Sequence, residues 1–278
     1  MSRELNCAIS ESVWQVLQSE VERTQTSLDY TVERALVSFF GLDHHSLFQV
    51  STSGALVEGV FQGCTRVSDL KRHGDFGLGT FPSLDGEMIM IDGNCYQALA
   101  GGHLREAEDD WLVPFAVVTR FSADREHRLQ NITSFDELEQ KIAHLRPSEN
   151  VFVGMRLEGS FVTLNLRTAC KANPGEDLVT ATSHQSVFEL SEVQGTLVGF
   201  WTPTYARTIN VPGYHLHFIS SDYKYGGHVL DLKAKELNLD LHLETDFHMA
   251  IPETKEFLQA DLSGDPTDDL NIAERSRG

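Results

Sequence analysis

Residues 213–232, GYHLHFISSDYKYGGHVLDL, constrain the fold of this chain more than any other stretch. Alternate residues of a strand share a face, so His215 and His217 place their imidazoles on the same side. The segment Ser221–Gly226 is long enough to turn the chain back, which brings His228 onto the next strand, near the first two. A glycine pair precedes His228 and allows a close backbone approach. The pattern predicts a β-hairpin that gathers three histidines.

Three converging imidazoles are typical of a divalent metal site. Zinc takes neutral histidine nitrogen, and catalytic zinc sites often use three protein ligands with one open position. An HxH pair alone is more often satisfied by ordinary hydrogen bonds, and the chain has 12 histidines. The third histidine in the same short hairpin favours metal binding over ordinary hydrogen bonding. Three buried imidazoles without a metal would cost free energy if any became charged. We therefore predict that His215, His217 and His228 are metal ligands, and assign no role to His242 or His248.

The remainder of the chain after residue 46 consists of short β-rich runs separated by glycine turns. GEMIMIDGNCYQALA predicts a hairpin with strands Glu87–Ile91 and Asn94–Ala98 around an Asp92-Gly93 turn. VFVGMRLEG and SFVTLNLRTA predict a second hairpin around Glu158-Gly159.

One helix interrupts these strands. SFDELEQKIAHLRP has a capping box of Ser134 and Glu137 and ends at Pro147. The acidic, polar tail from Asp261 is by itself typical of a solvated end. We predict an α+β fold with two β-sheet-based subdomains of mixed or antiparallel strands, few helices, and a possible subdomain boundary near 172–195.

An N-terminal extension, residues 1–45, precedes this domain of residues 46–278. Apolar residues recur at helical spacing from Val13 to Val21 and from Leu28 to Phe39, with Ser10 as N-cap and Gly41 closing the second helix. With the strand-like LNCAIS before them, the two helices resemble a ribbon-helix-helix unit, which dimerises through its strand. The predicted strand lacks basic residues, so we expect a dimerisation or packing arm and not a DNA reader.

Charge and cysteine content exclude several classes of protein. The formal net charge is −19, and no Lys/Arg run exceeds Lys71-Arg72, so we expect no nucleic-acid partner. The four cysteines form no CxxC pair, which is typical of reduced thiols. The sequence MSRELNCAIS has no export signal, and no apolar run reaches the roughly 18 residues that span a bilayer. We therefore expect a cytoplasmic protein with no membrane partner.

Two charged residues in β-rich runs are weaker candidates for a site. Glu87 shares a strand face with Ile89 and Ile91, so its carboxylate lies either at a sheet edge in water or in a site. Arg167 is either an exposed cation or a bidentate partner for a substrate carboxylate. The glycine-rich HGDFGLGTF is not a phosphate loop, because no GKS/T follows.

Three long motifs, HGDFGLGTFPSLDGEMIMIDGNCYQ, GTLVGFWTPTYA and GYHLHFISSDYKYGGHVLDL, resemble the acetolactate decarboxylase family. The resemblance runs from about Phe48 to the C-terminus. It implies a lyase that removes CO2 from 2-acetolactate and yields acetoin, in the route toward butanediol. It also implies a divalent metal, usually zinc, a homodimer, and an α/β build with two sheets.

The resemblance assigns roles residue by residue. The family's metal ligands fall on the three histidines, in agreement with the spacing argument. Its other site residues, among them a glutamate from the C-terminal tail, fall on Thr80, Glu87, Arg167 and Glu274. We expect Arg167 to orient the substrate and Thr80 to hydrogen-bond it, with Glu87 or Glu274 donating the proton to a zinc-stabilised enediolate. The run ACKANPGEDL after Arg167 departs from the family pattern, which predicts a reshaped loop.

Two other functions remain as alternatives. A cupin-type dioxygenase also begins with HxH, but it adds a glutamate a few residues later, and Phe218–Ser221 contain none. A metal-responsive ribbon-helix-helix DNA-binding regulator would explain the helical extension together with the histidines. Such a regulator needs a basic ribbon, whereas residues 1–40 hold Arg3, Arg23 and Arg34 against six acidic residues.

Overall fold

The computed structural model describes residues 5–40 and 45–275. The chain divides into two compact units, residues 1–44 and residues 45–278, which are described separately. Among the described residues, no helix combines the length and apolarity needed to span a membrane.

The N-terminal unit contains two helices, α1 (Glu11–Thr24) and α2 (Leu28–Phe40), which confirms the predicted pair. Ser10 caps α1 by accepting a hydrogen bond from the backbone N–H of Val13. The predicted strand in LNCAIS does not form within one copy of the chain, because residues 5–10 are assigned no strand and pair with no described segment. A strand needs a partner, and this unit offers none. The predicted closing residue Gly41 lies outside the described residues.

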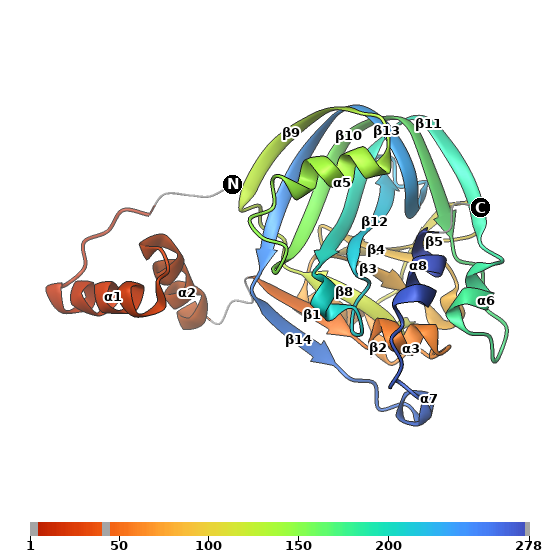
Figure 1. Cartoon of the computed structure of the whole chain (residues 1–278), viewed down its shortest axis with the longest axis horizontal. Coiled ribbons are helices and arrows are strands. Elements are labelled where there is room, and N and C mark those ends of the chain that lie inside the picture. Colours follow the sequence, from red (N-terminus) through yellow and green to blue (C-terminus); the bar gives the residue numbers. More distant parts are fainter. Residues whose placement is uncertain (1–4, 41–44, 276–278) are drawn as a thin grey trace. The chain divides into compact units, whose positions relative to one another are not determined.

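The second unit is built mostly from strands (Figure 1). Its helices are short: α3 (Ser53–Val57), α4 (Val67–His73), α5 (Phe135–Ala143), α6 (Leu178–Thr182), α7 (Lys255–Gln259) and α8 (Thr267–Arg275). Its strands form a seven-stranded sheet, a five-stranded sheet and the small pair β2 (Thr65–Arg66) and β7 (Leu112–Val113). The predicted α+β class with few helices is confirmed.

The seven-stranded sheet is antiparallel except at one edge, where β1 runs parallel to β14. Its order is β14 (Asp246–Ala250), β1 (Ser46–Val50), β8 (Phe115–Thr119), β3 (Phe76–Thr80), β4 (Glu87–Ile91), β5 (Asn94–Ala98), β6 (Leu104–Glu106). Every residue of β3, β4 and β8 is buried, so the centre of this sheet is covered on both faces. The predicted hairpin of β4 and β5 is confirmed with the predicted bounds, and Asp92 and Gly93 both take positive φ in its turn.

The five-stranded sheet contains the three longest strands of the described chain. Its order is β10 (Phe152–Thr168), β11 (Ser186–Thr202), β12 (Gly213–Ser220), β13 (Gly226–Glu244), β9 (Arg125–Ile132), and β13 also pairs with β10. The prediction of a hairpin around Glu158-Gly159 is wrong, because β10 continues through both residues. The pairing of β10 with β13 shifts register near Ser160 and Phe161, which is a β-bulge or similar irregularity. Such an irregularity lets a strand bend without a turn, and both neighbouring strands are long enough to follow it.

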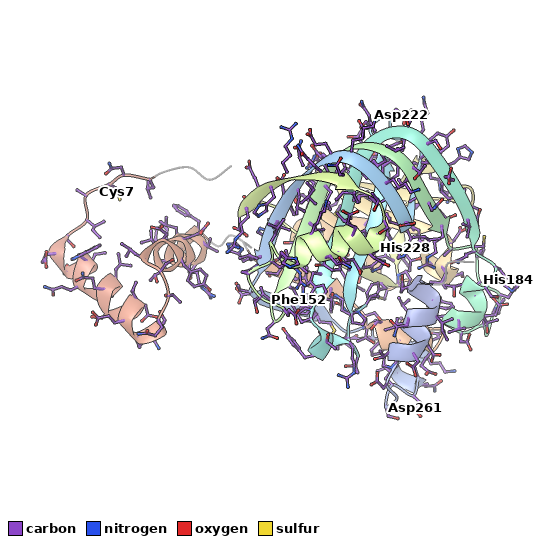
Figure 2. All side chains as sticks on the ribbon, turned by 45° about the horizontal axis from the view of Figure 1, so that its top comes forward. Cys7, Phe152, His184, Asp222, His228 and Asp261 are labelled. Carbon is purple, nitrogen blue, oxygen red and sulfur yellow. The ribbon has the colours of Figure 1, made fainter. Side chains whose placement is uncertain are left out.

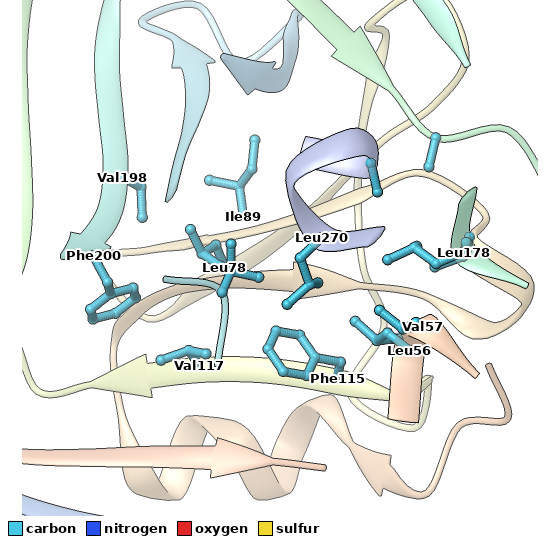
Figure 3. Packing of buried hydrophobic residues seen from close by; sticks show 14 of the residues in the cluster. Leu56, Val57, Leu78, Ile89, Phe115, Val117, Leu178, Val198, Phe200 and Leu270 are labelled. Atoms are coloured by element: carbon cyan, nitrogen blue, oxygen red, sulfur yellow. The ribbon is translucent and has the colours of Figure 1, made fainter. Parts of the chain in front are cut away.

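Apolar side chains fill three layers around these sheets. One cluster lies within the curve of the five-stranded sheet, and another covers the face of the seven-stranded sheet next to α4. The third lies between the two sheets and includes residues of α3, α6 and α8. In this third layer, Leu270 of α8 packs beside Leu78 and Phe115 (Figure 3).

Helices cover the open sides of the sheets. Helix α5 lies across the five-stranded sheet against β9 and β13 (Figure 1), and Ser134 caps it as predicted, by accepting from the N–H of Glu137. The prediction of a solvated tail after Asp261 is wrong for α8, because Leu270 and Ala273 are buried in the core. This helix gives the C-terminal segment an ordered position next to the histidine strands.

Candidate active site

The hairpin of β12 and β13 places the three predicted ligands together. His217 pairs directly with His228 across the two strands, and His215 lies two residues before His217 on the same face. All three imidazoles are buried, with exposed fractions of 9%, 1% and 4% in chain order. His228 lies beside helix α8 (Figure 2), whose Glu274 carbonyl oxygen is 3.2 Å from its Nε2.

The ring nitrogens face a common point. Nε2 of His215 and Nε2 of His217 are 3.2 Å apart, and one nitrogen of each of the three rings lies within 4.8 Å of the other two. Nδ1 of His217 is 2.9 Å from the carbonyl oxygen of Met88, so it carries the proton and leaves a lone pair on Nε2. Nδ1 of His228 is buried and has no hydrogen-bond partner in the described part of the chain. These atoms fit a metal ion, since three lone pairs converge and one buried nitrogen is otherwise unsatisfied.

The protonation state of the three imidazoles also suits metal binding. Burial lowers the pKa of His217 to about 4, and the pKa values of His215 and His228 are lowered well below 6.5, first by burial and then by neighbouring charged groups that include Arg167. Metal ligation requires neutral imidazole. The three rings are therefore in the state that binds a cation.

Glu274 and Arg167 form an ion pair at the edge of this cluster. Oε2 of Glu274 lies 2.7 Å from Nη2 of Arg167, 3.5 Å from Nδ1 of His228 and 3.8 Å from Nε2 of His215. Nη1 of Arg167 donates to Gln185 at 3.0 Å, while its buried Nε–H has no hydrogen-bond partner among the described residues. The guanidinium thus keeps one donor for a bound molecule.

Glu87, at the start of β4, lies next to His217. Its Oε2 is 3.7 Å from Nε2 of His217, and its Oε1 accepts from the backbone N–H of Ala169 at 2.9 Å. Burial raises the pKa of Glu87 to about 7, against the lowering effect of Arg167. A bound dication would oppose this rise. Thr80 pairs with Glu87 across β3 and β4, and its hydroxyl donates to the carbonyl oxygen of Gly86, so only its acceptor lone pairs remain for a ligand.

A pocket opens onto this cluster from one side. Its charged and polar lining includes Asp136, Glu139, His215, His228 and Glu274, together with apolar residues of β12, β13 and α8. Glu87, Arg167 and His217 do not line it. Arg167 and Glu274 pair at 2.7 Å, so Glu274 connects the pocket lining to the buried arginine.

The structure thus brings together all seven predicted site residues, from β3, β4, β10, β12, β13 and α8. The sequence did not indicate Gln185 or the Met88 carbonyl, because one lies in a loop and the other is a backbone atom. Neither has a side-chain pattern that could have revealed it.

A second group of potential ligands contains His45, Asp124 and His242. Nδ1 of His45 is 2.6 Å from the carbonyl oxygen of Leu243, and Nδ1 of His242 is 2.6 Å from that of Ser122. Both nitrogens therefore act as proton donors, and the two rings stack with centroids 4.9 Å apart instead of facing a shared point. This group fits a hydrogen-bond network better than a metal site.

Comparisons with known proteins address the resemblance directly. The alpha-acetolactate decarboxylase family model matches residues 47–264. A curated alpha-acetolactate decarboxylase from Methanosarcina mazei is 44% identical over 230 residues, which cover 82% of this chain and 80% of the relative. Another, from Brevibacillus brevis, is 40% identical over 232 residues, covering 83% and 81%.

A solved structure gives the same result for the fold. The crystal structure of alpha-acetolactate decarboxylase from Bacillus subtilis strain 168 matches with a TM-score of 0.81 and 34% identity, covering 83% of this chain and 100% of that chain. These matches favour the decarboxylase prediction over the regulator. The family match spans most of the chain, and the chain belongs to the alpha-acetolactate decarboxylase family.

Proposed function

We propose that this protein converts 2-acetolactate to acetoin and CO2 as a metal-dependent lyase in acetoin and butanediol biosynthesis. The observation that carries the proposal is the convergence of three neutral, buried imidazoles next to an arginine and two carboxylates. Membership of the decarboxylase family supports it independently.

His215, His217 and His228 are the proposed metal ligands, and zinc is the proposed ion because it prefers neutral histidine nitrogen. Glu274 is near enough to two of these rings to contribute a further oxygen. When bound, zinc supplies a Lewis acid that stabilises developing negative charge on the substrate oxygens.

The side chains around this centre perform the remaining tasks. 2-Acetolactate carries a ketone, a hydroxyl and a carboxylate around one carbon. When the carbon–carboxylate bond breaks, its electron pair passes to the neighbouring ketone, which gives an enediolate. We assign Arg167 to orient the substrate. Gln185 and Glu274 hold its two Nη groups, and its buried Nε–H has no partner among the described residues and can donate to a substrate oxygen.

The enediolate then needs one proton on carbon to become acetoin. Glu87 is the proposed donor because it is buried, lies beside His217 and is fixed by the N–H of Ala169. Donation from one fixed side would give a single acetoin enantiomer. Glu274, which is paired with Arg167, is the competing donor. Thr80 is positioned to accept a hydrogen bond near Glu87.

We also propose a cytoplasmic homodimer that acts on a small molecule and binds neither nucleic acid nor membrane. The four cysteines, Cys7, Cys64, Cys95 and Cys170, are all free thiols, which is typical of a reducing compartment.

The deciding experiment measures acetoin formed from racemic 2-acetolactate with and without a chelator. We expect acetoin well above the spontaneous rate, loss of activity on chelation, and recovery when zinc is added back. Replacement of His217 by alanine should abolish both stoichiometric metal and turnover. Acetoin formation no faster than in buffer, by protein with its metal content restored, would refute the proposal.

A further inference from the structure

The N-terminal unit carries an apolar surface that its own two helices do not cover. Neither α1 nor α2 has a buried residue. Half of the sixteen exposed large apolar side chains on the described residues lie in residues 5–40, with exposed fractions from 37% to 81%: Leu5, Ile9, Val13, Trp14, Val16, Leu36, Phe39 and Phe40. An apolar surface this dense on so short a segment marks an interaction site.

The unit is too small to be stable with this surface in water. Its helices have 14 and 13 residues, and isolated helices of about that length are marginal. Chains below roughly 40 residues usually need disulfides, metals or oligomerisation to fold. Cys7 is a free thiol, and neither metal-binding group on the described residues includes a residue of this unit, so packing against another protein surface is the remaining route.

The segment before α1 indicates what the partner is. Residues 5–9 form neither helix nor strand, and no backbone hydrogen bond joins them to any other residue within 5–40 or 45–275. In an extended conformation Leu5, Cys7 and Ile9 alternate on one face, and the order Leu-Asn-Cys-Ala-Ile is nearly symmetric about Cys7. In an antiparallel pair of two such segments, Leu5 would face Ile9 of the second copy, and Cys7 would face its own counterpart. The segment is therefore complementary to itself.

Charge and area agree with a second copy as the occupant. Residues 5–40 hold five carboxylates and two arginines, a net charge that repels nucleic acid and anionic membranes. A standard protein interface takes about 800 Å² from each partner, and eight large side chains exposed to this extent provide an area of that order. A twofold pair buries the same apolar face of both copies.

We propose that residues 5–40 are a self-association module that binds the same segment of a second copy of this chain. Residues 5–9 pair antiparallel about Cys7, and the apolar faces of α1 and α2 pack against those of the second copy. The module joins chains independently of the catalytic unit, and the proposal does not depend on the decarboxylase assignment.

Cross-linking through Cys7 tests the pairing in the full-length protein. Opposite positions of an antiparallel pair place their Cβ atoms about 4.5–5.5 Å apart, close to disulfide geometry. With copper(II) phenanthroline as oxidant, two thiols lose two protons and two electrons, and the linked dimer is read on a non-reducing gel. We expect rapid linkage that Cys7→Ser abolishes and that Ile9→Lys and Phe39→Lys each slow at least tenfold. Leu258→Lys, at an equally exposed leucine of α7, is the matched control and should leave the rate unchanged.

A second cross-linking experiment fixes the register. Leu5→Cys and Ile9→Cys are made separately in the Cys7→Ser background, one with an affinity tag. The mixture should form the 5-to-9 linked heterodimer at least tenfold faster than either variant links with itself. Circular dichroism and thermal unfolding confirm that each variant keeps a folded catalytic unit.

Three outcomes would overturn the proposal. Absent Cys7 linkage would mean that the two segments do not meet, and linkage whose rate is unaffected by Ile9→Lys would mean random collision. Faster self-linkage of the Leu5→Cys variant or the Ile9→Cys variant would mean that the segments do not pair antiparallel. Protection of Cys7 from a maleimide without any intermolecular link would assign the apolar surface to the chain's own catalytic unit.

Discussion

Two carboxylates share the site but have different surroundings. Glu87 is buried, accepts a backbone hydrogen bond from Ala169, and has its pKa raised to about 7 by burial. Glu274 is ion-paired with Arg167 at 2.7 Å and lines the pocket. Environments that differ in this way separate the roles of acid and anion in one site. We therefore assign proton donation to Glu87 and charge balance to Glu274.

Glu87→Gln tests that assignment. Glutamine keeps the acceptor for the Ala169 N–H and the volume of the side chain, but it cannot donate the proton. We expect turnover to fall about 10²–10⁴-fold, the typical contribution of a positioned general acid, while metal content measured by atomic absorption stays at the wild-type level. Glu158→Gln, at a half-exposed carboxylate on β10, is the control. Full turnover of Glu87→Gln would remove Glu87 from the chemistry.

Glu244, at the end of β13, is a buried carboxylate that does not belong to the candidate site. It is 3% exposed, and neither carboxylate oxygen has a hydrogen-bond partner within residues 5–40 and 45–275. His242 Nε2 is 3.7 Å from Oε1, and Asp124 lies on the other side of that ring. Burial raises the pKa of Glu244 to about 7, partly offset by His242. The folded state therefore holds the proton of Glu244 more tightly than the unfolded chain does.

The sign of the resulting pH dependence follows from linkage. A folded pKa raised above the unfolded value of 4.5 gives stability that is complete below pH 4.5 and is lost as the pH rises through about 7. A pKa difference of one is worth about 1.4 kcal/mol, so the cost at pH 8 is on the order of 3 kcal/mol. Glu244→Gln should raise the thermal unfolding midpoint at pH 8 by several degrees and change it little at pH 5. Glu236→Gln, at an exposed carboxylate paired with Arg128, should show no such gain; equal effects of both variants would contradict this explanation.

At the scale of elements, α8 connects the core to the site. Its Leu270 and Ala273 are buried between the sheets, and the next residue, Glu274, contacts Arg167 and His228. A helix of nine residues has little stability of its own. The apolar contacts of Leu270 and Ala273 therefore hold Glu274 in the site.

Leu270→Ala should detach this helix. Truncating a buried leucine costs about 2–5 kcal/mol, which exceeds what so short a helix can supply. We expect turnover to fall at least tenfold and amide exchange to accelerate in residues 267–275, with little change elsewhere. Ile272→Ala, on the half-exposed side of the same helix, is the matched control. If both variants retain activity and protection, other contacts position Glu274.

The elements that sequence could predict are those with local signals. The Asp92-Gly93 turn and the Ser134 cap fix their own hairpin and helix, because the required backbone angles and hydrogen bonds lie within a few residues. Glu158-Gly159 has the composition of a turn but lies inside β10, where pairing with both β11 and β13 keeps the strand continuous. Such pairing comes from residues far along the chain and has no local signature.

The candidate site also divides into residues that local sequence signals predicted and residues that they could not predict. Spacing alone was sufficient to bring together His215, His217 and His228, since a hairpin is local. Glu87, Arg167 and Glu274 come from three other elements, and only the family resemblance grouped them. Gln185, which holds Arg167, is on a loop whose path depends on α6 and α8, so no pattern in the sequence could place it.

At the scale of the whole molecule, charge sets the conditions for substrate capture. The chain carries a formal net charge of −19, although 2-acetolactate is an anion, and Asp136 and Glu139 add two carboxylates to the pocket lining. The cationic groups that attract a carboxylate, Arg167 and any metal held by the histidines, lie next to Glu274. The long-range field therefore opposes entry of the substrate, while the short-range field favours its binding.

Salt separates these two fields, because screening acts over about 30 Å at 0.01 M ionic strength and about 10 Å at 0.1 M. Raising an inert salt from about 10 to about 200 mM should increase kcat/KM severalfold by weakening the long-range repulsion, and should leave kcat nearly constant because the buried site is screened less. The double variant Asp136→Asn, Glu139→Gln should flatten the salt dependence, whereas Glu126→Gln on β9, away from the pocket, should not. A decrease of kcat/KM with salt would mean that the cationic centre controls the field at the mouth, and that the acidic surface does not oppose capture.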